Sequence, residues 1–303
     1  MIPQMQKEKN NDIIFSKAKL AFSMAVFGTI GIFVRNIPFP SGFIAMARGF
    51  LGVAFLLLLN LFRRRRIDFA AVKKNIALLI ASGAAIGCNW MFLFLSYNYT
   101  SVATATLCYY LAPIFVLLAS PFVLKEKLTA KKIVCVLCAL VGMVFVSGIA
   151  QSGFPGGNEL KGILFGIGAA VFYSTVMLLN KKLRDINDTD RTIFQLFFAA
   201  VAVTPYVLLK ENVATLDYSV KAVFLLILLG VVHTGFSYTL YFGSVGRLSA
   251  QTTALFSYID PALAILLSAL VLREKLTLFG AIGAVLILGS TLFGEIDFKR
   301  KKK

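Results

Sequence analysis

The stretch from Ser249 to Thr277, SAQTTALFSYIDPALAILLSALVLREKLT, decides the fold of this chain. It starts polar and then stays apolar for about twenty residues, the length that crosses a bilayer as a helix. Pro261 lies near its middle, directly after Asp260. An earlier stretch from Ser101 to Thr129, SVATATLCYYLAPIFVLLASPFVLKEKLT, repeats the pattern without a gap. An internal repeat of this kind sets the architecture of the whole chain.

The two copies are identical at nearly half of their positions. Pro113 aligns with Pro261, and Tyr110 aligns with Tyr258. The Lys-Glu-Lys-Leu-Thr that ends the first copy aligns with the Arg-Glu-Lys-Leu-Thr that ends the second. The chain therefore has two related halves, and the glycine-rich segment 151–157 marks the break between them.

The composition is that of a membrane protein. The chain has 303 residues, of which 58% are apolar and 15% are charged, and its mean hydropathy is +0.82. A soluble protein carries about 25% charged residues. Only helices and closed barrels satisfy their backbone polar groups inside lipid, and continuous apolar runs favour helices. We expect an all-α integral membrane protein.

Ten apolar runs are long enough to be transmembrane helices. They cover residues 18–34, 43–62, 76–95, 102–122, 133–150, 162–179, 192–209, 222–242, 252–272 and 278–294. They predict an N-terminal segment 1–17, a first five-helix repeat 18–150, a second five-helix repeat 158–294 and a basic tail 295–303.

Lysine and arginine in the loops predict the orientation. With both termini in the cytoplasm, the cytoplasmic side carries about four times as many of them as the outer side. We therefore expect a multi-pass protein of the plasma or inner cell membrane. The net charge of +17 is explained by basic loops, such as 63–66, and by the basic tail. These segments are expected to contact anionic lipid, and nucleic acid is not an expected partner.

Orientation and repeat together predict an inverted duplication. Because each half has five spans, an odd number, the second half enters the membrane from the opposite side. Two inverted five-helix repeats are a hallmark of secondary transporters, in which the substrate site lies near the bilayer midplane between the halves.

The chain resembles the drug/metabolite transporter superfamily, in particular its ten-helix EamA-type members. The resemblance is carried by the two proline-centred spans with their Glu-Lys-Leu-Thr ends, by Tyr-Leu-Ala-Pro113 and Tyr-Ile-Asp-Pro261, and by the Arg-Gly-Phe-Leu that starts at Arg48. It implies export, or less often import, of amino acids, other metabolites or drugs through a central cavity lined by both halves.

Two prolines are candidate hinges. Pro113 and Pro261 each lack an N–H and clash with the carbonyl four residues earlier, so each should kink its helix. The freed carbonyls, of Tyr109 and Ser257, must find a partner or line a wet cavity. A static kink satisfied by a neighbouring hydroxyl is the alternative to a hinge.

Asp260, His233 and Arg48 lie inside the spans and are candidate functional residues. An acid near the middle of a membrane is costly, so Asp260 is expected to bind a substrate amine or to carry a proton. Its alternative role is a structural hydrogen bond or an ion pair with Arg48. His233, the only histidine, can relay a proton or be held by a neighbouring hydroxyl. Arg48 either snorkels to the helix end or binds a substrate carboxylate.

Aromatic and polar side chains away from the helix ends are expected to line the cavity, since rings with a polar tip suit an amphipathic substrate. The expected lining set is Asn89, Trp90, Tyr109, Tyr110, Tyr173, His233, Ser237, Tyr238, Ser257, Tyr258 and Asp260.

The expected function is secondary transport, with export favoured, of small organic metabolites such as amino acids. A carrier for drugs or cationic compounds, a passive facilitator and a non-transporting membrane sensor are the alternatives, and proton coupling is open. No enzyme motif, cofactor or metal site is expected; the pair Cys135 and Cys138 lies on a spanning helix without further ligands. The oligomeric state is a monomer or a homodimer.

Overall fold

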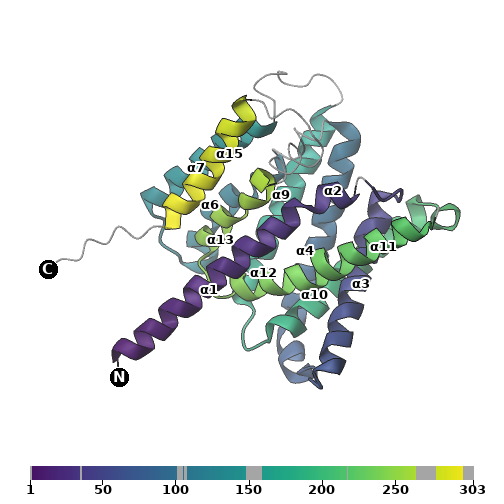
Figure 1. Cartoon of the computed structure of the whole chain (residues 1–303), viewed down its shortest axis with the longest axis horizontal. Coiled ribbons are helices and arrows are strands. Elements are labelled where there is room, and N and C mark those ends of the chain that lie inside the picture. The colour runs from purple at the N-terminus through teal and green to yellow at the C-terminus, as the bar shows by residue number, and fades with distance from the viewer. Residues whose placement is uncertain are drawn as a thin grey trace.

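The computed structural model describes residues 2–34, 36–100, 105, 108–147, 159–216, 218–263 and 278–295. Helices and their connections make up these residues, and no strand occurs among them (Figure 1). The prediction of an all-helical protein is therefore confirmed over the described part of the chain.

Six helices are described in the first half. They are α1 (Ile2–Gly28), α2 (Ile30–Val34), α3 (Ser41–Phe62), α4 (Phe69–Tyr99), α6 (Ala112–Leu124) and α7 (Ala130–Ser147). Helix α1 begins well before the predicted span 18–34, and the helix is interrupted at Thr29 between α1 and α2.

The second half repeats this pattern. Its elements are α9 (Glu159–Lys182), α10 (Asp188–Lys210), the 3₁₀ turn η1 (Val213–Thr215), α11 (Val220–Leu228), the π-helix η2 (Leu229–Phe236), α12 (Ser237–Val245), α13 (Ala250–Phe256) and α15 (Leu278–Glu295). The first and last residue numbers of α15 are those of α7 plus 148, and the same difference separates Ser101 from Ser249.

Among the described residues, five helices are long and apolar enough to cross a membrane. They are Ser41–Phe62, Phe69–Leu93, Leu160–Lys182, Asp188–Lys210 and Val220–Val245. Ala112–Leu124 and Leu278–Ser290 are shorter apolar helices. Several membrane-crossing helices are thus confirmed, whereas the count of ten is not. The spans 18–34 and 102–122 are interrupted, and 264–272 of the span 252–272 lies outside the described residues.

Helices of one half pack on helices of the other. Helix α7 lies along its counterpart α15, and α3 lies along its counterpart α10 (Figure 1). Helices α4 and α9 also form an extended contact. Small residues allow the close approach: a Cβ on Gly142 of α7 would lie 2.8 Å from the carbonyl oxygen of Gly283 in α15. The core is therefore an interface between the two repeats.

Candidate functional site

Both proline-centred spans are broken just before the proline. The first is interrupted by a turn at Tyr110 and Leu111, and α6 begins at Ala112. Pro113 therefore lies in the first turn of α6, where a missing N–H leaves no hydrogen bond unmade. In the second copy α13 ends at Phe256, a turn follows, and Pro261 lies in the next helical segment. The predicted kink takes the form of a break, and the hinge role stays a prediction.

The two breaks meet in the interior. Tyr110 and Tyr258, which occupy equivalent positions in the repeat, are both buried, and their ring centroids are 6.2 Å apart. The Tyr258 hydroxyl donates to the Tyr110 carbonyl oxygen at 3.2 Å. The Asp260 side chain is hydrogen-bonded by the Tyr110 side chain. Asp260 is thus held at the contact between the two halves, and the position equivalent to it in the first half is Ala112.

A chain of tyrosines leads away from this contact. Tyr109 packs edge-on against Tyr110 and stacks on Tyr173 of α9, with centroids 5.3 Å apart and ring planes 19° apart. Tyr241 of α12 donates to the Tyr173 hydroxyl at 3.3 Å. Tyr241 then contacts Tyr238, one helical turn earlier. Tyr241 was absent from the predicted lining set, although it lies on the same helix as the predicted Tyr238.

The chain of rings ends at a buried cation. Trp90 of α4 packs edge-on against Tyr238 with centroids 6.3 Å apart. The guanidinium carbon of Arg48 lies 4.4 Å from the centroid of the Trp90 ring. Arg48 is only 6% exposed, so it does not snorkel to water. Arg48 and Asp260 form no ion pair with each other within the described ranges.

His233 lies beside this cluster, in the π-helix η2. Its Nε2 is hydrogen-bonded to the Thr29 hydroxyl at 2.8 Å, and Phe33 packs edge-on against its ring at 4.7 Å. The imidazole also interacts electrostatically with Arg48. The neighbouring-hydroxyl alternative is therefore observed, at the point where α1 is interrupted. π-Helical turns often occur at functional sites, so the location keeps His233 a candidate.

Three of the predicted lining residues donate side-chain hydrogen bonds to backbone carbonyl oxygens. Asn89 donates to Ala169 of α9 at 2.8 Å, Ser237 to Val232 at 2.8 Å, and Ser257 to Ala254 at 2.7 Å. Each bond has a structural role, and their contact with substrate stays a prediction. Within the described ranges, no three His, Cys, Asp or Glu side chains come together to hold a metal ion.

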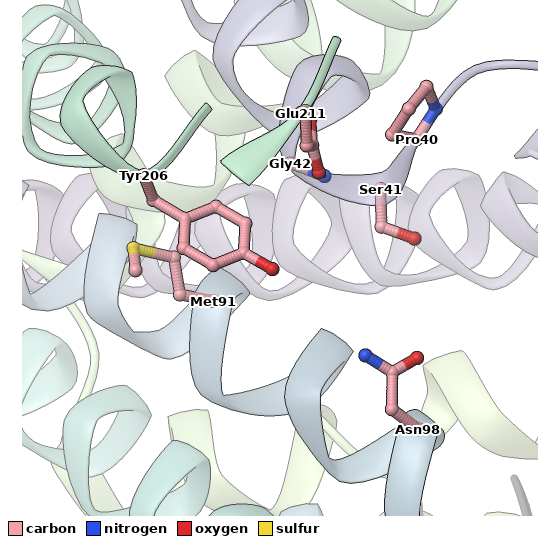
Figure 2. Close-up of a pocket in the computed structure, with 7 residues that line it drawn as sticks. All are labelled: Pro40, Ser41, Gly42, Met91, Asn98, Tyr206 and Glu211. Carbon is pink, nitrogen blue, oxygen red and sulfur yellow. The ribbon is translucent and has the colours of Figure 1, made fainter. Parts of the chain in front are cut away.

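A pocket of about 210 Å³ opens where α3 begins and α4 and α10 end. In Figure 2 the Tyr206 hydroxyl points into this space and Asn98 lies across from Ser41. None of the predicted site residues lines it, but Met91 in its wall is the sequence neighbour of Trp90. The lining residues are Pro40, Ser41, Gly42, Met91, Asn98, Tyr206 and Glu211.

The opposite end of the helices is closed by contacts between the halves. Both carboxylate oxygens of Glu126, in the Lys-Glu-Lys-Leu-Thr segment, accept from the backbone N–H of Ala250 at 3.1 Å. Lys132 of α7 donates to Thr252 at 2.9 Å, and Gln251 donates to the carbonyl of Lys127 at 3.0 Å. The Lys-Glu-Lys-Leu-Thr end of the first repeat copy therefore holds the start of α13.

Fold and site together define a multi-pass helical membrane protein with an aromatic centre between two related halves. The sequence pattern of the EamA-like transporter family matches residues 18–148 and again residues 160–293. The chain belongs to the EamA-like transporter family. The resemblance drawn from the repeat motifs is thereby confirmed.

Relatives agree with this family, and a solved structure has the same fold. An uncharacterized transporter of Bacillus subtilis, YxxF, is 29% identical over 93% of this chain and 88% of its own length. An uncharacterized transporter of Archaeoglobus fulgidus is 26% identical over 92% of this chain and 95% of its own. One crystal structure has the same fold, with a TM-score of 0.81 at 18% identity over 92% of this chain and 97% of that chain. The protein is therefore a multi-pass membrane transporter.

Proposed function

We propose that the chain is a secondary transporter of small organic metabolites, such as amino acids, and that it works by alternating access between two inverted five-helix repeats. The observation that carries the proposal is the cluster from Trp90 to Asp260, because it joins residues of both halves in the interior. A site shared by two inverted halves can face one side of the membrane and then the other.

The chemistry of the cluster suits an amphipathic organic solute. Aromatic rings offer apolar area, and the tyrosine hydroxyls add hydrogen-bond partners. Asp260 at one end of the cluster can accept from an ammonium group, and Arg48 at the other end supplies a cation. Asp260 and His233 permit proton coupling, yet a passive facilitator needs the same residues. We take export as the working direction, following the family resemblance.

The two ends of the helices support alternating access. The pocket beside Glu211 and Asn98 lies on the side that the loop charges predict to be external. The contacts of Glu126 with Ala250 close the side predicted to be cytoplasmic. We therefore assign this arrangement to an outward-facing state of the transport cycle.

Counterflow in proteoliposomes tests the proposal. Proteoliposomes that contain the purified protein are loaded with an unlabelled compound, and uptake of the labelled compound is followed for a panel of amino acids and cationic drugs, with and without a pH gradient. Transient accumulation of at least one compound is expected. Stimulation by a pH gradient supports proton coupling, and its absence supports facilitation. Saturable binding without flux of any compound contradicts the proposal and favours a sensor.

A further inference from the structure

Arg48 differs from the other buried arginine in how its charge is satisfied. Arg191 of α10 donates to the carbonyl oxygen of Phe242 at 2.8 Å and lies 4.0 Å from the carboxylate of Asp188. Arg48 is buried to the same degree. Within the described ranges, however, no carboxylate pairs with Arg48, while the Nε–H has no hydrogen-bond acceptor in either arginine. A structural arginine is therefore visible in the same molecule, and Arg48 does not have its pattern of contacts.

The surroundings of Arg48 satisfy its guanidinium only in part. Trp90 covers its face, in the arrangement of a cation–π contact. Arg48 is hydrogen-bonded to the Tyr238 side chain and interacts electrostatically with Tyr238 and Tyr109. Phenols and an indole ring lower the cost of a buried cation without neutralising it. The in-plane N–H groups are the part of a guanidinium that a carboxylate engages with two parallel hydrogen bonds.

We infer that Arg48, on its Trp90 platform, is the subsite for an anionic group of the transported molecule, most simply a carboxylate. The inference rests on the proposed transport function and deepens it, since it makes Arg48 the residue that selects anionic over neutral compounds. The position fits this role because Trp90 and Tyr109 come from the first half and Tyr238 from the second. Movement of the halves past each other would change the contacts around the bound anion.

The chain contains its own reporter for this subsite. Trp90 is the one tryptophan of the sequence, so tryptophan emission reports the environment of the ring on which Arg48 lies. Purified protein is titrated with pairs of compounds that differ only at the acid group, namely benzoate and benzamide, and N-acetylphenylalanine and its primary amide. We expect at least one acid to change the emission saturably and to bind at least tenfold more tightly than its amide.

Substitution of the arginine separates the role of its charge from its packing. Arg48→Gln should bring the acid-to-amide ratio of affinities close to one, while Arg48→Lys should retain part of the preference. Arg191→Gln is the matched control, because it also removes a buried guanidinium but should leave the ratio unchanged. The ratio is internal to each preparation, so partial loss of folded protein does not mimic the result.

The outcomes distinguish this inference from the proposed function. Equal binding of acid and amide by the unsubstituted protein, no response to any acid, or an unchanged ratio in Arg48→Gln overturns the anionic subsite. Counterflow of neutral or cationic compounds would still support transport in each of these cases. Absence of counterflow for every compound would remove the transport proposal, whatever Trp90 reports.

Discussion

At the scale of single residues, the placement of Asp260 is the most informative feature. Its side chain is hydrogen-bonded by Tyr110 of the other half, and Tyr173 of α9 interacts with it electrostatically. It has no cationic partner among the described residues. An acid in the interior of a membrane protein usually has a functional role, and this one lies at the contact of the two repeat copies.

Replacement of Asp260 by Asn removes the charge and keeps the shape. Since a hydrogen bond to a charged group contributes about 1.5–3 kcal/mol, flux should fall about tenfold or more. Initial rates of uptake into proteoliposomes are the measurement. Gel filtration and thermal unfolding must show that the variant remains folded. A variant that transports at the unsubstituted rate would exclude Asp260 from the mechanism.

At the scale of helices, Glu126 and α13 form a contact that can open and close. The N-terminus of a helix has unpaired N–H groups and a partial positive charge, which a carboxylate satisfies well. Glu126 comes from the first half, whereas α13 belongs to the second. In the proposed transport cycle this bond breaks when the halves separate at this end, and it forms again when they close.

Glu126→Gln should weaken this closure. The loss of a capping carboxylate costs about 1 kcal/mol, which shifts the ratio of closed to open molecules roughly fivefold. A cysteine at Ala254, which is fully buried in α13, measures the opening in a background without native cysteines. Its labelling by an impermeant maleimide in inside-out vesicles should become faster in the Glu126→Gln variant.

A second carboxylate provides the control for this experiment. Glu211 accepts from the backbone N–H groups of Gly42 and Phe43 at the start of α3, at the pocket end. Glu211→Gln removes an equivalent cap but should not accelerate labelling at Ala254. Equal acceleration by both substitutions would indicate general destabilisation, and no acceleration by Glu126→Gln would show that this contact does not govern access.

The close contact of α7 with α15 predicts how a substitution there changes the stability of the protein. Gly142 has no space for a side chain, because a Cβ would also lie 2.9 Å from Ile287 Cγ1. Gly142→Val should destabilise the protein by about 1–3 kcal/mol through overpacking. Thermal unfolding in detergent measures the loss. Gly289→Val, where a Cβ meets nothing within 4 Å, is the control, and an equal loss there would contradict the packing argument.

At the scale of the whole molecule, the sidedness of the loops follows from the inverted arrangement. The turn after α10 and the turn after α3 should lie on opposite sides of the membrane. A cysteine at Ala214 should react with an impermeant reagent in intact cells, and one at Arg66 only in inside-out vesicles; both positions are exposed. Labelling of both from the same side would rule out the proposed topology.

Much of the fold could be predicted because the repeat can be detected from identical residues at aligned positions. The shift between Tyr110 and Tyr258 is also the shift between α7 and α15, so one alignment anticipated the pairing of the halves. The form of the proline breaks was less predictable. A proline clash can be relieved by bending a helix or by starting a new one, and the neighbouring turn decides between them.

Only part of the candidate site could be predicted, because its residues differ in how clearly the sequence marks them. Tyrosines and Trp90 can be recognised in the sequence as aromatic rings with a polar tip, and several of them do contact one another in one cluster. The pocket residues Pro40, Gly42 and Met91 carry no such signal, since the pocket arises from three helix ends far apart in the chain. Asn89 shows the converse, because its amide satisfies a backbone carbonyl that no sequence pattern reveals.

Asp260 occupies a repeat position that is an alanine in the first copy, and this difference has a kinetic consequence. In the proposed alternating-access cycle the duplicated scaffold has two conformations of similar shape, but only one copy brings a carboxylate to the centre. The outward and inward forms are therefore chemically unequal, and the half-saturating concentration should differ between the two membrane faces. Without a coupled ion, detailed balance requires the maximal velocities in the two directions to differ by the same factor. The protein would therefore bring its solute to equal concentrations on both sides, although its transport rates at saturation differ between the two directions.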